Sequence, residues 1–138
     1  MNESILVDMS ATIIHHGHIR LLKKARKIGE VIVALTSDEE IRKHKGYQPE
    51  LAYEFRKEIL ESIRYVNKVI KSPWHINNNF LEKSGAKYLL HGSDNSNDIH
   101  EDKLIIINRT EGISSSLIRT RVTRTILSKA GLPTDLTQ

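Results

Sequence analysis

The chain has 138 residues, 38% hydrophobic and 28% charged, and a formal net charge of +4; this length suits a single domain with a hydrophobic core. Its lack of cysteine excludes disulfide bonds and thiolate metal sites, and no apolar run approaches the roughly 18 residues of a membrane span or forms a secretory signal. We therefore expect a cytoplasmic protein with no membrane partner, whose slight basic excess suits an anionic small molecule better than nucleic acid, because the basic residues are scattered and aromatic residues are few.

Apolar runs typical of buried strands alternate with helical patterns along the chain. In chain order we expect a strand over residues 5–7, a helix over 19–28, a strand over 31–35, a helix beginning near 37–40, a loop over 43–50 and a helix over 54–66. The pattern continues with a strand over 69–70, a short helix over 75–82, strands over 88–90 and 104–107, and a last helix from about 115. Gly29 is predicted to end the first helix in a left-handed conformation.

The alternation of strands and helices predicts an α/β fold, with five parallel strands in one sheet and helices on both faces. No repeat or linker divides the chain, so we expect one domain over residues 1–130 and a flexible polar tail over 131–138. Ligands of such sheets bind beyond the carboxyl ends of the strands. One shared site is predicted there, because polar segments follow four of the strands, at residues 15–18, 43–45, 92–98 and 109–116.

The motif His15-His16-Gly17-His18 lies between the first strand and the first helix. A glycine lets the backbone approach a ligand closely, and imidazoles at a helix N-terminus can donate hydrogen bonds to phosphate oxygens, aided by the helix dipole. Donors in such positions stabilise the charge that develops during phosphoryl transfer. Two alternatives are a zinc site, for which the spacing places no third ligand, and a histidine-rich turn without a ligand.

The second motif, Arg109 to Ser116, lies between the last strand and the last helix. Ser114, Ser115 and Ser116 follow Gly112 at the predicted helix start, where hydroxyls and free amides can bind an anion. Arg109 adds a planar guanidinium that can bind phosphate through two hydrogen bonds. The alternative is a simple N-terminal cap by serine, which needs no ligand.

Four further polar residues are candidates for the site, each with a structural alternative. Lys43 and Lys45 could hold a triphosphate or a phosphate-bearing acceptor, or they could belong to a solvated basic loop. Arg64 could reach the site from the end of its helix or pair with an acidic side chain. Asp94 lies in a polar segment where it could serve only as a turn residue.

Together these motifs resemble the signature of the small bacterial cytidylyltransferases. The likeness rests on the HxGH motif at residues 15–18, the stretch YEFRKEILESIRYV at 53–66 and the run RTEGISSS at 109–116, which occur in the family's order and spacing. It covers about residues 4–125 and, within the family, is strongest for the enzymes that act on glycerol 3-phosphate. The resemblance implies a Rossmann-like nucleotidyltransferase fold and a homodimer.

The reaction that the resemblance implies joins CTP and a small phosphomonoester, with Mg²⁺, to give a CDP-linked product and pyrophosphate. By position, His15 and His18 would stabilise the transition state at the α-phosphate and the leaving pyrophosphate. Lys43 or Lys45 would hold acceptor and triphosphate charge, and Arg109 with the serine helix start would hold the β- and γ-phosphates. Such catalysis acts by positioning and electrostatics, so it requires no nucleophilic side chain.

The remaining site positions also follow from the resemblance. The nucleotide-binding positions that it implies are Met9, Ser10, Gly17, Gly92, Asp94, Arg109, Gly112, Ile113, Ser114, Ser115 and Ser116. The acceptor-binding positions that it implies are Thr12, Lys43, Arg64 and Trp74. No residue is assigned as a metal ligand.

Several positions depart from the family pattern and leave the acceptor open. Thr12 and Asn67 each stand where the family has an aspartate, and Asn95 stands where it has a tryptophan. The run DMSA at 8–11 also resembles cytidylyltransferase domains linked to phosphoenolpyruvate mutase, so 2-aminoethylphosphonate or 2-hydroxyethylphosphonate is an alternative acceptor, as are phosphoethanolamine and phosphocholine. An adenylyltransferase of the same fold and a non-catalytic nucleotide-binding module are further alternatives.

Overall fold

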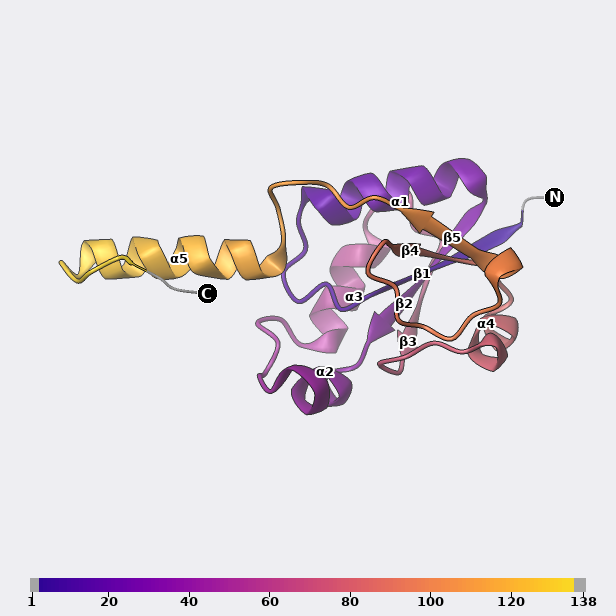
Figure 1. Cartoon of the computed structure of the whole chain (residues 1–138), viewed down its shortest axis with the longest axis horizontal. Coiled ribbons are helices and arrows are strands. Elements are labelled where there is room, and N and C mark those ends of the chain that lie inside the picture. Colours follow the sequence, from indigo (N-terminus) through magenta and orange to yellow (C-terminus); the bar gives the residue numbers. More distant parts are fainter. Residues whose placement is uncertain (1–2, 136–138) are drawn as a thin grey trace.

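The computed structural model describes residues 3–135 of the chain. Five parallel strands form one sheet in the order β3-β2-β1-β4-β5, with helices on both faces (Figure 1), which confirms the predicted α/β fold. The strands are β1 (Ser4–Met9), β2 (Glu30–Thr36), β3 (Lys68–Ser72), β4 (Tyr88–Gly92) and β5 (Leu104–Ile107). The helices are α1 (His16–Ile28), α2 (Asp38–Lys45), α3 (Tyr53–Glu61), α4 (Asn78–Ser84) and α5 (Ser115–Lys129), with a short 3-10 helix at Glu101–Lys103.

Two hydrophobic cores lie on opposite faces of the sheet, because successive side chains of a strand point to opposite faces. Val7 of β1 packs in one core with Leu22 of α1 and Leu60 of α3. Leu6 of the same strand packs in the other core with Leu81 of α4. Both faces of the central strands are thus covered, and polar side chains are left to gather at the ends of the strands.

The strand order fixes which ends form a crevice. The chain passes from β1 to β2 on one side of the sheet and later adds β4 on the other side of β1. In open parallel sheets, a crevice opens at the carboxyl ends of the two strands where the winding direction changes. Here those strands are β1 and β4, and the loops that follow them carry the predicted polar segments.

Several helix boundaries differ from the predicted ones, including the start of α1, which lies at His16 rather than at residue 19. α2 continues to Lys45 where a loop was expected, and Gly46 ends it in the left-handed conformation (φ +75°). α3 ends at Glu61 rather than at residue 66, because the chain then follows consecutive tight turns. α4 begins only after Asn77, whose side chain accepts a hydrogen bond from the first turn and caps the helix.

Gly29 ends α1 in an extended conformation (φ −176°), so the predicted left-handed cap was wrong. A glycine is needed there for a different reason: a Cβ atom would lie 2.0 Å from the carbonyl oxygen of Glu3. The same carbonyl accepts a hydrogen bond from the N–H of Glu30 at 2.8 Å. This close approach lets β2 begin directly after α1, beside β1.

Helix α5 projects from the body of the molecule (Figure 1) and has no buried residue. Val122 and Ile126 on this helix are 51% and 61% exposed. Residues 131–135 follow without helix or strand, and the end of the predicted tail, 136–138, lies outside the described residues. Within residues 3–135, no helix is both long enough and apolar enough to cross a membrane.

Candidate active site

A cavity of about 400 Å³ opens at the carboxyl ends of the strands. The predicted site residues that line it are Met9, Ser10, Thr12, His15, Gly17, His18, Lys45, Trp74, Gly92, Asp94, Arg109, Ile113, Ser114, Ser115 and Ser116. The fold therefore brings the histidine motif and the serine motif, which are far apart in the sequence, to one cavity.

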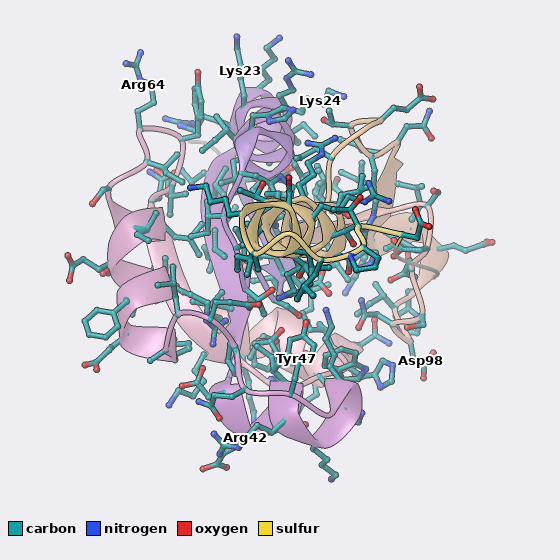
Figure 2. The ribbon with its side chains drawn as sticks, turned by 90° about the vertical axis from the view of Figure 1, so that its left-hand side faces the viewer. Lys23, Lys24, Arg42, Tyr47, Arg64 and Asp98 are labelled. Carbon is teal, nitrogen blue, oxygen red and sulfur yellow. The ribbon has the colours of Figure 1, made fainter. Side chains whose placement is uncertain are left out.

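Three predicted site residues lie outside this cavity. Lys43 is exposed on α2, two residues before Lys45, and positions two apart on a helix face different directions. Arg64 is exposed in the turn after α3 and points outward, away from α5, in Figure 2. Gly112 has a φ of +77° and turns the chain ahead of α5, so its role is conformational.

The hydrogen bonds of the histidine motif fix the tautomers of its two imidazoles. The N–H of Gly17 donates to Nδ1 of His15, and the N–H of His15 donates to Nδ1 of His18, each at 3.1 Å. Because a backbone N–H can only donate, both Nδ1 atoms are unprotonated acceptors and, in the neutral rings, the proton is assigned to Nε2. Each ring therefore offers an Nε2–H as the donor to a ligand.

Both imidazoles have lowered pKa values. Burial, together with the charges of His16 and Arg109, lowers the pKa of His15. Burial, His15 and Arg109 lower the pKa of His18 to about 3. His18 thus serves as a neutral hydrogen-bond donor whose charge does not change as the pH varies around neutrality, and the lowered pKa of His15 favours its neutral ring.

The histidine motif and the serine motif are in direct contact. The hydroxyl of Ser115 donates to the carbonyl oxygen of Ile13 at 3.0 Å, which ties the start of α5 to the loop after β1. A side chain at Gly17 would press on both motifs, because a Cβ atom there would lie 2.9 Å from Cε1 of His15 and 3.1 Å from Cγ2 of Ile113. The lack of a side chain at Gly17 therefore allows the two motifs to approach.

One of the three serines at the start of α5 caps the helix, and all three lie beside the cavity. The hydroxyl of Ser114 accepts from the N–H of Leu117 at 3.0 Å, so the predicted alternative of an N-terminal cap is correct for this residue. Ser114, Ser115 and Ser116 nevertheless all line the cavity. The first amides of α5, which have no acceptor within the helix, are thereby placed beside the space where an anion would bind.

Arg56 holds the loop after β1 and was missed by the sequence analysis. Its side chain is fully buried, and the guanidinium donates to the carbonyl oxygens of Ser10 at 2.6 Å and Thr36 at 3.0 Å and to the carboxylate of Asp38 at 2.6 Å. The next residue after Ser10, Ala11, has an unusual positive φ of 45°. The Nε of Arg56 also donates to the carbonyl oxygen of Leu51 at 3.0 Å. A fully buried arginine with these four partners thus fixes the backbone from which the histidine motif begins. The available signal was the helical spacing of four between Arg56 and the buried Leu60.

Arg119 lines the cavity and was also missed. One guanidinium nitrogen donates to the hydroxyl of Thr12 at 2.6 Å, and two nitrogens bind the carboxylate of Glu50. The guanidinium lies 4.6 Å from the centre of the Tyr47 ring. This cluster joins α5 to the loop between α2 and α3 at the mouth of the cavity. Arg119 follows Ser115 by one helical turn, so the sequence could have predicted that the two residues face the same site.

Trp74 forms an aromatic wall on the side of the cavity formed by the loop after β3. Its ring stacks on His44 at 4.7 Å with an angle of 8° between the planes, and Nζ of Lys45 lies 5.8 Å from its centre. Nε2 of His75 lies 3.3 Å from the hydroxyl of Ser96. Lys45 therefore adds a cation beside Trp74, which suits a phosphate, while Nε2 of His44 faces the carboxylate of Glu40 at 3.1 Å.

A family model described as Cytidylyltransferase-like matches residues 10–121 of the chain. Since this match spans most of the chain, the protein belongs to the cytidylyltransferase-like family and is a nucleotidyltransferase.

Two bacterial relatives are glycerol-3-phosphate cytidylyltransferases. The protein from Staphylococcus aureus is 41% identical over 115 residues, which cover 78% of this chain and 85% of that one. The protein from Bacillus subtilis is 32% identical over 115 residues, which cover 80% and 89%. The crystal structure of the lipopolysaccharide core biosynthesis protein from Thermoplasma volcanium matches with a TM-score of 0.68 at 17% identity, covering 80% of this chain and 100% of that one, and supports the fold.

Proposed function

We propose that the protein transfers a cytidylyl group from CTP to a small phosphomonoester, with glycerol 3-phosphate as the acceptor. An oxygen of the acceptor phosphate attacks the α-phosphorus in line, and the bond from that phosphorus to the oxygen of the β-phosphate breaks. The electron pair stays on the departing oxygen, so the products are CDP-glycerol and pyrophosphate. The observation that carries the proposal is the contact of the start of α5 with the loop that leads into the histidine motif, which gathers His15, His18 and the start of α5 around one cavity.

Each part of the cavity has a distinct electrostatic role in this reaction. The Nε2–H groups of His15 and His18 would donate to the α-phosphate and to the leaving pyrophosphate, where negative charge develops. Arg109 and the first amides of α5 would bind the β- and γ-phosphates. Lys45, beside Trp74, would hold the phosphate of the acceptor. The reaction would take place in the cytoplasm, where CTP is available.

The charges around Trp74 favour a polyol phosphate over an acceptor with an ammonium group. An ammonium group needs a free carboxylate or an open aromatic face. Among the described residues lining the cavity, the carboxylates are Asp8 and Asp94, which already bind His91 and Arg109. The Trp74 ring is stacked on His44 and lies near Lys45. Apart from its phosphate, glycerol 3-phosphate carries only hydroxyls, which Lys45 does not repel as it would repel an ammonium group.

This preference predicts the outcome of an acceptor panel. With CTP, we expect kcat/KM for glycerol 3-phosphate to exceed that for phosphoethanolamine, phosphocholine and 2-aminoethylphosphonate by on the order of tenfold or more, because like charges repel in the cavity. Pyrophosphate release measures each rate. The matched pair of 2-hydroxyethylphosphonate and 2-aminoethylphosphonate differs only in hydroxyl against ammonium. A faster rate with the ammonium member of that pair would overturn the proposed acceptor.

Mg²⁺ would enter this site with the nucleotide. The described residues contain no group of three or more histidine, cysteine, aspartate or glutamate side chains that could hold a metal ion. Mg²⁺ commonly keeps several waters and binds through phosphate oxygens with one or two carboxylates at most. The donors of the cavity therefore fit an ion carried mainly by the triphosphate, where it would offset negative charge on the phosphates.

We also propose that the chain forms a homodimer through α5. This helix has no buried residue, exposes Val122 and Ile126, and carries basic side chains without acidic ones. Helix α3 exposes an apolar pair, Phe55 and Ile59, beside exposed glutamates. The two surfaces are complementary in charge and both apolar at their centres, so α5 of one copy can pack on α3 of a second copy.

Replacing Ile126 by glutamate is expected to convert the dimer to a monomer, because the change places a charge in the apolar stripe of α5. Sedimentation velocity of wild type and variant across a concentration series measures the change. Ser128→Glu adds the same charge on the opposite side of the helix and serves as the control, for which a dimer is expected. A monomeric wild type, or a dimer that Ile126→Glu leaves intact, would contradict this role of α5.

A further inference from the structure

A partly buried polar cluster lines the cavity between β1 and β4. Asp8 and His91 lie on neighbouring strands, and Nδ1 of His91 is 2.5 Å from Oδ1 of Asp8. The other oxygen of Asp8 accepts a hydrogen bond from Asn97 at 3.1 Å. The side chains of Asp8 and His91 are only 12% and 17% exposed. One ring nitrogen of His91 is thus fully engaged, and the orientation of the imidazole is fixed.

The second ring nitrogen of His91 faces Asp94 without reaching it. Nε2 of His91 lies 3.6 Å from Oδ1 of Asp94, which is too far for a hydrogen bond. The other oxygen of Asp94 accepts from Arg109 at 2.7 Å. The carboxylate of Asp94 therefore lies between the imidazole of His91 and the guanidinium of Arg109, and among the described residues it binds Arg109.

This arrangement occupies Arg109, which the proposed reaction needs for the phosphates. Gly92 permits the contact, because a Cβ atom there would lie 2.9 Å from Nε of Arg109 and 2.9 Å from Oδ1 of Asp94. Both partners of the ion pair are mainly solvent-exposed, Arg109 at 65% and Asp94 at 58%. A pair so exposed is weak, so the triphosphate can draw Arg109 away. Asp94 is then free to bind another partner.

We propose that His91, held by Asp8, is a positioning residue that binds Asp94 when CTP draws Arg109 away. This inference rests on the proposed function. A small rotation of the Asp94 side chain closes the gap to Nε2 of His91, and the carboxylate then no longer competes with the phosphates for Arg109. His91 thereby acts on nucleotide affinity without touching the nucleotide.

The charges around His91 favour this exchange. Burial and the nearby Arg109 lower the pKa of His91, but Asp8, through its hydrogen bond and charge, and Asp94 outweigh them and raise the pKa above 6.5. Below that pKa the imidazole is cationic and binds Asp94 strongly. As the pH rises through it, the ring loses its charge and Asp94 returns to Arg109. CTP affinity should therefore fall with rising pH.

The test compares CTP binding to wild type and His91→Gln by calorimetry, without acceptor, from about pH 6 to about pH 9. At low pH we expect the variant to bind CTP about tenfold more weakly than the wild type, because a charge-assisted hydrogen bond is lost. The variant should also lack the fall in CTP affinity with rising pH that His91 causes in the wild type. With acceptor, KM for CTP should rise by about the same factor while kcat changes little. His100→Gln replaces an exposed imidazole outside the cavity and should match the wild type.

Three results would overturn the proposal: identical pH dependence of wild type and His91→Gln, a loss confined to kcat, or no CTP binding by the wild type. The first two leave the proposed reaction standing and reject only the role of His91. Conversely, if no acceptor supports pyrophosphate release but the two proteins still differ in CTP affinity as expected, the acceptor reaction fails and the role of His91 is retained.

Discussion

Replacing His18 by alanine is expected to lower kcat by about 10²–10³-fold, the effect of losing one donor to charge that develops in the transition state. The Nδ1 atom of His18 accepts from the N–H of His15, which leaves Nε2–H for the ligand. The variant also loses this contact at the start of α1, at a cost of about 1 kcal/mol of stability. Pyrophosphate release at saturating CTP and glycerol 3-phosphate measures the rate, and thermal unfolding verifies the fold.

His16→Ala is the matched control for this prediction. His16 belongs to the same motif but is exposed and does not line the cavity, so its replacement should leave kcat close to that of the wild type. Because the pKa of His18 is about 3, no loss of rate from protonation of this ring is expected around neutral pH. Full turnover by His18→Ala, or an equal loss in both variants, would remove His18 from the chemistry.

Replacing Arg56 by methionine is expected to lower the free energy of unfolding by about 3–5 kcal/mol, as when one partner of a buried ion pair is removed. Methionine preserves much of the packing of the arginine stem. It leaves the carboxylate of Asp38 and the carbonyl oxygens of Ser10, Thr36 and Leu51 without the guanidinium that now donates to them. Urea unfolding, with the slope compared between proteins, measures the change.

The control for Arg56 is the same substitution at an exposed arginine. Arg64 lies on the surface in the turn after α3, so Arg64→Met should change the free energy of unfolding by less than about 0.5 kcal/mol. If Arg56→Met unfolds at the same urea concentration as the wild type, the buried guanidinium does not hold the loop after β1 in the way that its contacts indicate.

The sheet could be predicted because its strands are short apolar runs with few alternatives. Residues 31–35 are continuous hydrophobic sequence, and they form most of β2. The helix ends were harder, because caps decide them: Asn77 starts α4 later than its apolar pattern indicates, and Gly46 ends α2 later. The projection of α5 away from the sheet could not be predicted. The helical spacing of Ile118, Val122 and Ile126 is equally compatible with a helix that packs on the sheet.

The two motifs of the site were visible in the sequence because each concentrates phosphate-binding groups at a helix start. The residues that support them were not. Arg56 is held by backbone carbonyls and a carboxylate from three separate segments, and no local pattern records such contacts. The pairing of Asp8 with His91 depends on β1 and β4 being neighbours, which requires the strand order. Lys43 and Lys45 were indistinguishable until α2 was seen to include both.

The measurement that tests the proposed reaction most directly is the stoichiometry of pyrophosphate and product with purified protein, Mg²⁺, glycerol 3-phosphate and either CTP or ATP. The proposed function predicts one pyrophosphate and one CDP-glycerol, identified by mass, for each CTP consumed, and a much slower reaction with ATP. Faster turnover of ATP would contradict the assignment of CTP. Binding of CTP without pyrophosphate release from any acceptor in the panel would contradict the reaction itself and favour a nucleotide-binding module.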